Sequence, residues 1–445
     1  MKLYSRLFSS ITSHNPHAYL LIVLFGGLFL YSCSTTEPFS GYSYDPPDVT
    51  DTQDKEILYQ NKRVIGFGQP RIWISNEFSG ARVSDAWLAS GLVQDTVVIR
   101  IKPENAPINN SPWYAFQIWS DQAHEVLIRL SYEGARHRYI PKIASITEPT
   151  NWNLLTDSTS YSADGSVHFN VQIGADKQWI AAHPIHPNSV EALEEYPESN
   201  GFASEILVDT VGYSHNNRAI LQWQSQDHAE IEKEGLLLLF SRQHPPEVSG
   251  YRSFLYFFNR LMGTDELAQA FRSNFHIIAY PMMNPDGVEQ GHWRHNSKGI
   301  DLNRDWEFFR QPETRSVRDA LSPLADGRYN VVYGIDFHST NENVFYPINE
   351  EVITGIDNFT QRWFPYVAEA NPELNFRSEE FEPNSPIAKN WVYKTFGTDA
   401  LTFEVEDELS EEAMQSLGHS AAESLMKLLL EELAAATNST GNKHQ

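Results

Sequence analysis

A histidine and a glutamate stand three residues apart just beyond an apolar stretch that is long enough for a strand. The predicted strand Leu236–Ser241 is followed by His244 and Glu247, with two prolines between them. An imidazole and a carboxylate that a tight turn brings together can hold one divalent cation from two sides. One such pair is expected about once by chance in a chain of this composition, so its position after a strand is what makes it a candidate site.

Four predicted strands end at residues that can bind a metal or transfer protons. Their ranges are Leu236–Ser241, His276–Met282, Val331–Phe337 and Ala400–Val405. The residues at or beyond their ends are His244 and Glu247, then Asn284-Pro285-Asp286-Gly287 with Trp293-Arg294 and Asp301-Leu302-Asn303-Arg304, then Asp336-Phe337-His338, and finally Thr402-Phe403-Glu404. In open α/β sheets, sites form outside the carboxyl ends of the strands. We therefore expect these four strand ends to converge on one site.

The second half of the chain alternates strand and helix patterns, which predicts an α/β domain over residues 206–435. Helices are expected at about 248–262 and 264–273. A longer helix is expected to begin after Ser410, because Glu411 and Glu412 favour the positive end of a helix dipole, and to run to about 435. The polar residues 436–445 are predicted to form a disordered tail.

Residues 61–190 show the two-residue periodicity of β-strands. In the stretch 167–173, apolar residues alternate with His168, Asn170 and Gln172. Several stretches of this kind, separated by turn residues and without a long helix, predict an antiparallel β-sandwich. Residues 191–205, which contain several glutamates with a proline and a glycine, are predicted to be a linker.

Composition narrows the class of protein. At 445 residues, with 41% hydrophobic and 13% aromatic residues, the chain can form two or three globular domains. Its formal net charge is −25 at pH 7. This charge argues against nucleic acid or an anionic membrane surface as a partner, because either would need a clustered cationic face.

The first 32 residues have the features of a signal peptide. A short basic start precedes an apolar run, residues 18–31, that is short for a bilayer span. The run ends at Ser32-Cys33, which resembles the lipobox of bacterial lipoproteins, and residues 33–60 would then be the lipidated cysteine and a flexible tether. We therefore expect a lipid anchor in the bacterial cell envelope, at its periplasmic or outer-membrane face; the alternative is an ordinary buried cysteine. Cys33 is the only cysteine in the chain, so no internal disulfide can form.

Taken in this order, the strand-end motifs resemble the zinc carboxypeptidase family typified by pancreatic carboxypeptidase A. The motif resemblance covers residues 235–408. A β-sandwich ahead of a compact catalytic domain is more similar to the cytosolic-carboxypeptidase branch of that family. The resemblance implies an N-terminal antiparallel β-sandwich followed by a mixed-sheet α/β zinc carboxypeptidase domain. It also implies a peptide substrate with a free C-terminal carboxylate.

The resemblance implies one Zn²⁺ per chain, held by His244, Glu247 and His338. Two neutral imidazoles and a carboxylate leave the fourth position of a catalytic zinc open to water, and zinc lowers the pKa of such a water to about 7. Asp301 is expected to hold the other ring nitrogen of His244.

The same resemblance assigns roles to four more side chains. Glu404 would be the general base that passes a proton from water to the leaving amine, although Glu406 lies two residues further on the same face of the strand. Arg294 would stabilise the negative oxygen that develops, a contribution of roughly 3–4 kcal/mol. Arg304, with Asn303, would bind the terminal carboxylate, because a guanidinium grips a carboxylate through two parallel hydrogen bonds.

Two positions bear on substrate specificity. Pro246 occupies the place where pancreatic enzymes have a substrate-binding arginine. Lys389 falls near the floor of the expected side-chain pocket, where it would favour an acidic terminal residue; the alternative is a lysine that points to solvent.

The sequence leaves other functions open. An envelope enzyme with this zinc site could instead trim the stem peptides of cell-wall murein, as a carboxypeptidase or amidase. A zinc deacylase acting on small N-acyl amino acids could share the same ligands. The alternative outside the enzymes is a non-catalytic, zinc-containing binding protein, because a β-sandwich is a kind of domain that recognises partners.

Overall fold

The computed structural model describes residues 56–441, except 90–95, 106–107, 186–188, 227–234, 326–329, 349–354, 357 and 382. The predicted signal peptide, Cys33 and nearly all of the predicted tether lie outside the described residues. Within the described part, no helix combines the length and apolar character that crossing a membrane requires. The N-terminal strands and the α/β domain belong to one compact unit.

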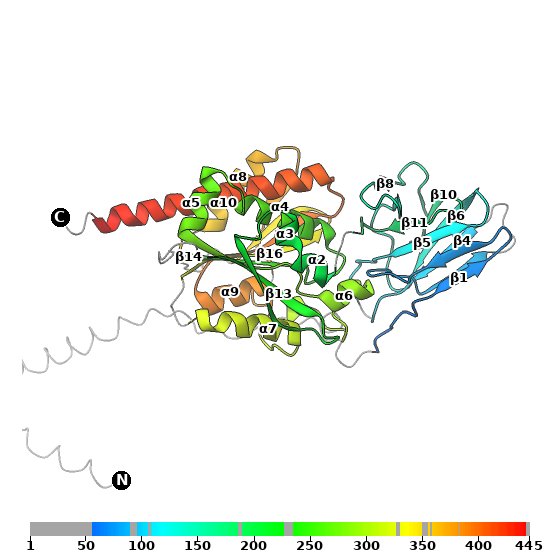
Figure 1. Ribbon diagram of the computed structural model, residues 1–445, viewed down its shortest axis with the longest axis horizontal. Coiled ribbons are helices and arrows are strands. Elements are labelled where there is room, and N and C mark those ends of the chain that lie inside the picture. Colours follow the sequence, from blue (N-terminus) through cyan, green and yellow to red (C-terminus); the bar gives the residue numbers. More distant parts are fainter. Residues whose placement is uncertain are drawn as a thin grey trace, which may run out of the picture. The chain divides into compact units, whose positions relative to one another are not determined.

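The N-terminal strands form two β-sheets that share one hydrophobic core (Figure 1). The first sheet has the order β1 (Val64–Phe67), β2 (Ile72–Ser75), β5 (Ala115–Ser120), β11 (Gln178–Ala181), β7 (Lys142–Ser145) and β8 (Asn153–Leu154). The second has the order β3 (Asp85–Ala89), β4 (Thr96–Ile101), β6 (His124–Tyr132), β10 (Val167–Ile173) and β9 (Ser160–Tyr161). The predicted β-sandwich is confirmed.

The core of the sandwich follows from the period-two pattern of its strands. In β10 the four apolar residues from Val167 to Ile173 are buried, while the residues that alternate with them are half-buried or exposed. β10 pairs antiparallel with β6. β4 and β6 pair in parallel, whereas the other strand pairs described in these two sheets are antiparallel. The sandwich is therefore antiparallel apart from this one pair.

An eight-stranded mixed sheet forms the centre of the α/β domain. Its order is β12 (Ile206–Tyr213), β13 (Ala219–Ser225), β15 (Phe275–Tyr280), β14 (Gly235–Ser241), β16 (Val331–Thr340), β19 (Ala400–Glu406), β17 (Asn343–Pro347) and β18 (Phe376–Ser378). The neighbours β15, β14, β16 and β19 are parallel to one another. These are the four strands predicted to carry the site, and their carboxyl ends lie at the same edge of the sheet.

Helices cover both faces of this sheet (Figure 1). One face packs against α4 (Val248–Leu261), α5 (Glu266–Asn274), α8 (Phe359–Ala370) and α10 (Glu411–Gly441), and the other packs against α7 (Pro312–Leu321) and α9 (Ala388–Phe396). The shorter helices are α2 (Val190–Glu194), α3 (Tyr196–Ser199), α6 (Pro285–Gln290) and the 3-10 turns Leu302–Arg304 and Ser322–Leu324. Because both faces of the sheet are covered, every residue of β14 is buried, which explains its unbroken apolar run.

Two segments differ from their predicted form. Residues 191–205, predicted as a linker, contain most of α2 and all of α3, and Leu193 is buried in the core of the α/β domain. This segment therefore packs against that domain. Helix α10 extends to Gly441, so the prediction of a disordered tail from residue 436 is wrong as far as 441. Ala434, Ala435 and Ala436 are strong helix formers, which favours this extension.

Candidate metal centre and catalytic cleft

The turn after β14 and the start of α4 bring the first candidate ligands to β16. Arg242 has a left-handed backbone conformation, with φ of 58°, and its Nε donates a hydrogen bond to the Pro245 carbonyl. The chain reverses here, and Glu247 immediately precedes α4. A Cβ on Gly250 would lie 2.1 Å from the His338 carbonyl oxygen, so only glycine allows α4 to approach β16 this closely. That approach places Glu247 beside His338.

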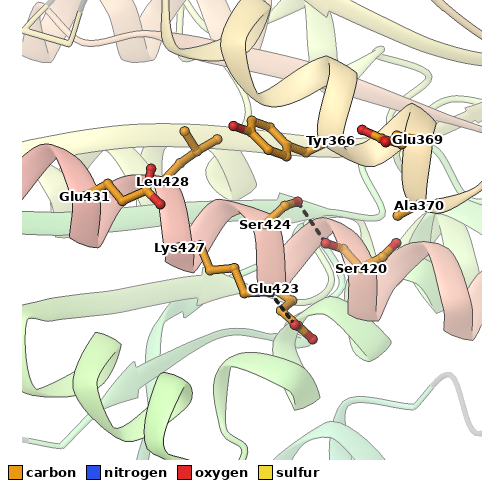
Figure 2. Close-up of a pocket in the computed structure, with 9 residues that line it drawn as sticks. All are labelled: Tyr366, Glu369, Ala370, Ser420, Glu423, Ser424, Lys427, Leu428 and Glu431. Carbon is orange, nitrogen blue, oxygen red and sulfur yellow. Dashed lines mark hydrogen bonds and ion pairs between the residues drawn. The ribbon is translucent and has the colours of Figure 1, made fainter.

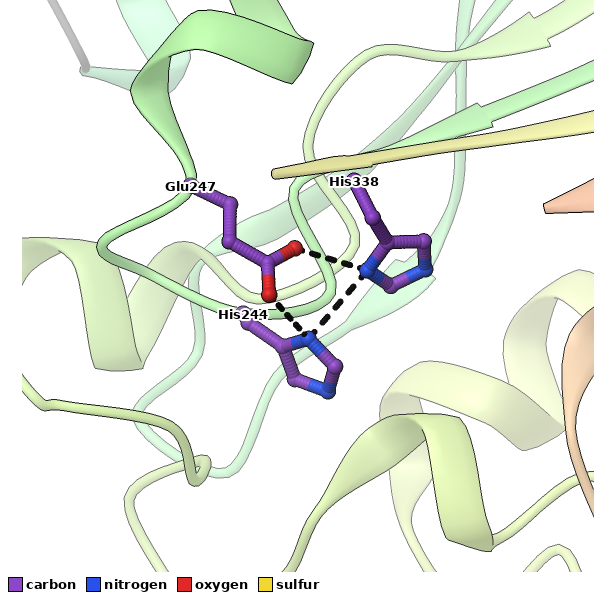
Figure 3. A group of neighbouring side chains, drawn as sticks. All are labelled: His244, Glu247 and His338. Atoms are coloured by element: carbon purple, nitrogen blue, oxygen red, sulfur yellow. Dashed lines mark hydrogen bonds and ion pairs between the residues drawn. The ribbon is translucent and has the colours of Figure 1, made fainter. Parts of the chain in front are cut away.

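The three predicted metal ligands converge on one point (Figure 3). Glu247 Oε1 lies 2.8 Å from His244 Nδ1, and Glu247 Oε2 lies 2.7 Å from His338 Nδ1. The two Nδ1 atoms are 3.2 Å apart, although the two histidines are 94 positions apart in the chain. The strand ends of β14 and β16 therefore assemble the cluster that their sequences predicted.

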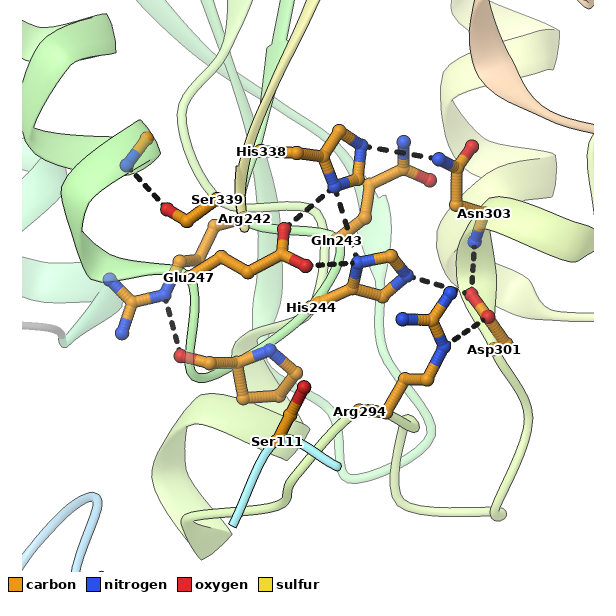
Figure 4. A network of polar contacts seen from close by, with 12 residues as sticks. Ser111, Arg242, Gln243, His244, Glu247, Arg294, Asp301, Asn303, His338 and Ser339 are labelled. Atoms are coloured by element: carbon orange, nitrogen blue, oxygen red, sulfur yellow. Dashed lines mark hydrogen bonds and ion pairs between the residues drawn. The ribbon is translucent and has the colours of Figure 1, made fainter. Parts of the chain in front are cut away.

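Each histidine is held on its far side by a carboxylate. Figure 4 shows the contact between His244 and Asp301. His244 Nε2 lies 2.9 Å from Asp301 Oδ1, as predicted, and His338 Nε2 lies 2.7 Å from Asp336 Oδ2. Because a carboxylate accepts a hydrogen bond, it keeps the ring proton on Nε2 and leaves a lone pair on Nδ1. Asp336 also accepts a hydrogen bond of 2.7 Å from Gln243 Nε2. Both rings are thus oriented to present Nδ1 to the cluster.

This set of donor atoms fits a zinc ion. With both rings protonated on Nε2, two lone pairs face each other at 3.2 Å, which is repulsive unless a cation lies between them. Two nitrogen ligands of a tetrahedral zinc, with bonds of roughly 2.0–2.1 Å, lie about 3.3 Å apart. Two imidazoles and one carboxylate are also a ligand set of catalytic zinc sites, in which a fourth position stays open.

The electrostatics of the cluster favour a positive charge at the same point. Burial lowers the pKa of His338, but the carboxylates of Asp336 and Glu247 outweigh burial and raise this pKa well above its usual value. Burial raises the pKa of Glu247, but His244 and His338 outweigh it and hold this pKa well below its usual value. A divalent cation between the rings would supply the charge that these carboxylates attract and would leave both imidazoles neutral.

Glu404 faces the metal ligands from the adjacent strand. His338 and Glu404 are direct partners in the parallel register of β16 and β19, and Glu404 lines the cleft. Burial and the neighbouring Glu247 carboxylate raise the pKa of Glu404 to about 7, although the histidines act in the opposite direction. Glu406, its rival on the same strand, lies outside the set of cleft-lining residues and accepts a hydrogen bond of 3.3 Å from Asn343 Nδ2. The cleft therefore holds Glu404, a carboxylate that can exchange a proton near neutral pH.

The segment after β15 supplies two arginines to the cleft. Arg294 Nε donates a hydrogen bond of 2.6 Å to Asp301 Oδ2, and Arg304 Nη1 donates one of 2.9 Å to the Asn303 carbonyl. Asp301 caps the short helix that carries Arg304, because its Oδ1 accepts from Asn303 N at 2.9 Å. Asp301 thus holds His244 and Arg294 and shapes the turn that carries Arg304.

Asn303 lines the cleft, but both ends of its amide contact protein groups. Its Oδ1 accepts a hydrogen bond from Ala388 N at 2.9 Å, and its Nδ2 lies 3.2 Å from His338 Nε2. Asn284 and Asp286 of the predicted strand-end motif lie outside the cleft-lining set. Asn284 caps α6, and Asp286 pairs with Arg218 at 2.8 Å. The Asn-Pro-Asp-Gly motif therefore shapes the loops around the site.

The cleft encloses about 380 Å³ and is lined by both domains. Asn109, Ser111 and Arg138 come from the sandwich. Arg138 donates hydrogen bonds of 2.9 and 2.6 Å to Asp407 Oδ2, beyond the end of β19, and one of 3.1 Å to Ser111 Oγ. No sequence pattern pointed to these residues. Arg138 and Asp407 are 269 positions apart, so no local pattern indicates that they meet.

Lys389 has neither of its two predicted environments. It is 1% exposed, and its Nζ donates hydrogen bonds of 2.7–3.1 Å to the carbonyls of Tyr346, Pro347 and Phe381. It also lies outside the set of cleft-lining residues. The burial contradicts a solvent-facing lysine, and the three carbonyl contacts give no support to a role in selecting an acidic terminal residue.

A second hollow, of about 450 Å³, lies between α8 and α10 (Figure 2). Lys427 Nζ pairs there with Glu423 Oε1 at 2.7 Å, and Ser424 Oγ donates a hydrogen bond of 2.8 Å to the Ser420 carbonyl. Its lining contains no histidine and comes from the outer helices, away from the strand ends. This hollow therefore lacks the groups that make the cleft at the strand ends a chemical site.

Known proteins resemble this chain in sequence and in fold. Residues 202–415 match the family described as zinc carboxypeptidase. Cytosolic carboxypeptidase 3 of Bos taurus is 24% identical over 65% of this chain, and this chain spans about a third (33%) of that protein's length. A metallo-carboxypeptidase from Burkholderia cenocepacia has a TM-score of 0.65 at 16% identity, over 80% of this chain and 98% of its own.

A metallo-carboxypeptidase from Pseudomonas aeruginosa, solved in complex with (2-guanidinoethylmercapto)succinic acid, has a TM-score of 0.63 at 21% identity, over 80% of this chain and 99% of its own. At these identities the two solved structures establish a shared fold. The sequence match of residues 202–415 adds the family, and the similarity to a cytosolic carboxypeptidase agrees with the branch that the sandwich indicates. Residues 202–415 therefore form a domain of the zinc carboxypeptidase family.

Proposed function

We propose that this protein is a zinc-dependent carboxypeptidase that removes the C-terminal residue from peptides. The observation that carries the proposal is the convergence of His244, Glu247 and His338 on one point, with Glu404 beside them in the same cleft. The chain spans only part of the cytosolic carboxypeptidase it resembles, so the proposal rests on the geometry of this site.

The residues of the cleft divide the chemistry among them. Zinc, when bound, supplies a Lewis acid that polarises the scissile carbonyl and makes water a nucleophile near neutral pH. Glu404 takes a proton from the attacking water and gives it to the amide nitrogen of the departing residue as the C–N bond breaks. Arg294, held at Nε by Asp301, offers its guanidinium to the negative charge that develops on the carbonyl oxygen.

Arg304 binds the terminal carboxylate of the substrate in this proposal. Support comes from its place in the cleft and from the short helix that Asp301 caps. A guanidinium offers two parallel hydrogen bonds to a carboxylate, which recognises a free chain end. Asn303 lines the cleft beside Arg304 and belongs to the same binding site in this proposal, and its Oδ1 accepts a hydrogen bond from Ala388 N at the start of α9.

Matched peptides that differ only at the C-terminus test the proposal. We expect the free acid to be hydrolysed at least about 100-fold more efficiently than its C-terminal amide, because the amide offers Arg304 only one acceptor oxygen and no negative charge. Arg304→Lys should reduce this preference, whereas Arg310→Lys, on the exposed side of the same segment, should not. Equal cleavage of acid and amide would contradict carboxypeptidase action. Purified murein fragments, as a third substrate, distinguish trimming of stem peptides from action on ordinary peptides.

We further propose that the chain is anchored in a bacterial envelope through Cys33. Support comes only from the sequence, in which a basic start and an apolar run precede Ser32-Cys33. Cys33→Ser should move the protein from the membrane fraction to the soluble fraction and abolish incorporation of a labelled fatty acid. Unchanged labelling of the variant would exclude this site of lipidation.

A further inference from the structure

The segment that carries Arg294 is embedded in the sandwich domain. Trp293 is fully buried within the sandwich core, and its indole Nε1 donates a hydrogen bond of 3.1 Å to the Trp113 carbonyl. Trp293 therefore packs in the sandwich core, while the guanidinium of the next residue, Arg294, lines the cleft. The backbone at this point belongs to both domains.

One buried carboxylate of the sandwich binds this backbone. Glu104 is 0% exposed, and its carboxylate accepts hydrogen bonds from three successive backbone N–H groups, those of Trp293 (2.8 Å), Arg294 (3.0 Å) and His295 (2.8 Å). Burial raises the pKa of Glu104, but His292, His295 and Arg82 outweigh burial and hold this pKa well below its usual value. The carboxylate is thus charged when it accepts these bonds, which strengthens each of them.

The neighbouring residue extends the same contact. Asn105 Oδ1 lies 2.6 Å from His295 Nδ1, and Asn105 Nδ2 donates a hydrogen bond of 3.1 Å to the Gly299 carbonyl. Two consecutive sandwich residues therefore hold the segment from Trp293 to Gly299, which ends two residues before Asp301. Asp301 in turn holds the Arg294 side chain at Nε.

We propose that Glu104 is a positioning residue of the catalytic site, which holds the backbone of Arg294 so that its guanidinium stays where negative charge develops. This inference rests on the proposed function, because Arg294 takes its role from that reaction. Glu104 touches neither substrate nor metal ligands; it acts through Arg294. The sandwich is then a working part of the peptidase.

The physical reason is preorganisation. A donor stabilises a transition state without further cost only if it is already held in place, and a displacement of about 1 Å can cost roughly 100-fold in rate. Asp301 holds the Arg294 side chain and Glu104 holds its backbone. Without Glu104 the backbone of Arg294 can shift, and Asp301 alone then positions the guanidinium. Because substrate binding through Arg304 is unaffected, kcat should fall while KM stays nearly constant.

A double-mutant cycle tests the inference on the full-length zinc-loaded protein. Glu104→Gln keeps the shape of the side chain but removes one acceptor oxygen and the charge. We expect kcat to fall at least about tenfold in the wild-type background and less than about threefold in the Arg294→Ala background, because residues that act as a unit are not additive. An equal factor in both backgrounds, or an unchanged kcat, would overturn the inference.

A matched control is a second carboxylate that makes hydrogen bonds across the same domain interface. Glu408 accepts hydrogen bonds of 2.8 Å from Ile140 N and from Lys142 Nζ of the sandwich, at a place remote from Arg294 in the chain. Glu408→Gln should leave kcat within about twofold of wild type, because it weakens the interface without loosening the Arg294 backbone. A loss as large as that of Glu104→Gln would overturn the specific role of Glu104.

Amide hydrogen exchange gives a readout that does not depend on activity. Residues 292–296 should exchange at least about tenfold faster in Glu104→Gln, while the metal content stays unchanged. If wild type hydrolyses no peptide, the proposed function falls, and faster exchange confined to this segment still supports positioning by Glu104. Unchanged exchange overturns it. If Glu104→Gln fails to fold, Asn105→Ala, which keeps the Glu104 carboxylate, replaces it. We expect this variant also to have a lower kcat and faster amide exchange in residues 292–296.

Discussion

Among the carboxylates around the candidate metal centre, four have shifted pKa values, and these four divide into two groups with opposite electrostatics. In the ligand group, Glu247 and Asp301, burial raises each pKa but neighbouring histidines and Arg294 outweigh it and hold both values well below the usual range. In the β19 group, Glu404 and Asp407, burial prevails and raises each pKa to about 7. The two groups line or border the same cleft.

The difference comes from partners rather than from depth. Each oxygen of Glu247 contacts an imidazole, whereas Glu404 Oε2 and Asp407 Oδ1 are buried without a hydrogen-bond partner in the described part of the chain. A carboxylate with two imidazole neighbours stays charged and can hold a cation. For Glu404, burial and the nearby Glu247 carboxylate raise the pKa to about 7, which suits a general base near neutral pH. One cleft therefore brings together carboxylates that stay charged and can support a metal ion, and carboxylates that can exchange a proton near neutral pH.

Breaking the ligand group should have the largest effect. His338→Ala removes one of three candidate ligands and leaves Glu247 with a single imidazole. We therefore expect the bound metal to be lost and the rate of hydrolysis to fall to that of the peptide without enzyme. Elemental analysis and kcat/KM, with and without a chelator, measure both. His419→Ala, a histidine on α10 remote from the cleft, should retain metal and activity. Full turnover by a metal-free His338→Ala protein would show that the reaction needs no metal here.

Breaking the β19 group should cost activity but not metal. Glu404→Gln removes the proton acceptor and leaves the three ligands intact, so we expect kcat to fall by roughly 10²- to 10⁴-fold with unchanged zinc content. Glu406→Gln is the matched control, because Glu406 lies two residues further on the same strand and contacts Asn343 outside the cleft. If Glu406→Gln were the more damaging change, the base would be the other glutamate.

The pH profile sharpens the comparison between the groups. Because the pKa of Glu404 is raised to about 7, Glu404 is protonated below that pH and cannot accept a proton. We expect kcat/KM to rise with pH, about tenfold per unit below the pKa, and then to level off. Bound zinc lowers this pKa, so in the zinc-loaded protein the rising part of the kcat/KM profile, its acid limb, lies at or below pH 7.

Asp407→Asn separates the two members of the β19 group in the same measurement. Asp407 has a similarly raised pKa, so a limb that persists in this variant belongs to Glu404. A flat kcat/KM between pH 5 and pH 8 in the zinc-loaded wild type would contradict a titrating base at the end of β19.

The smallest effect on catalysis should come from Lys389, which belongs to neither group. Lys389→Met leaves three backbone carbonyls without their donor, so we expect the free energy of unfolding to fall by about 1–3 kcal/mol. The ratio of kcat/KM for peptides ending in Glu and in Leu should stay within about twofold of wild type, because Lys389 does not line the cleft. Urea unfolding and the two peptides check this. A tenfold change in the ratio would place Lys389 in the specificity pocket.

Elements with a strong local pattern could be predicted from the sequence. β14 is buried on both faces, so its sequence is an unbroken apolar run. β10 is buried on one face, so apolar and polar residues alternate along it. The cluster of candidate metal ligands could be predicted because His244 and Glu247 closely follow β14 and His338 lies near the end of β16. The linker was misjudged because its charged residues hid Leu193, whose burial depends on the α/β core.

The sequence by itself determined the residue types and their order: an α/β alternation, a ligand pair after one strand, a histidine on the next, and a glutamate on the strand beside it. These features are local, because hydrophobic periodicity and strand ends are read within a few residues. Only the tertiary structure decided which carboxylates stay charged and that three carbonyls hold Lys389. It also decided that Arg138 of the sandwich lines the cleft and that Glu104 holds the backbone of Arg294. Those properties depend on burial and on partners up to 269 positions away in the chain, and no short-range pattern encodes them.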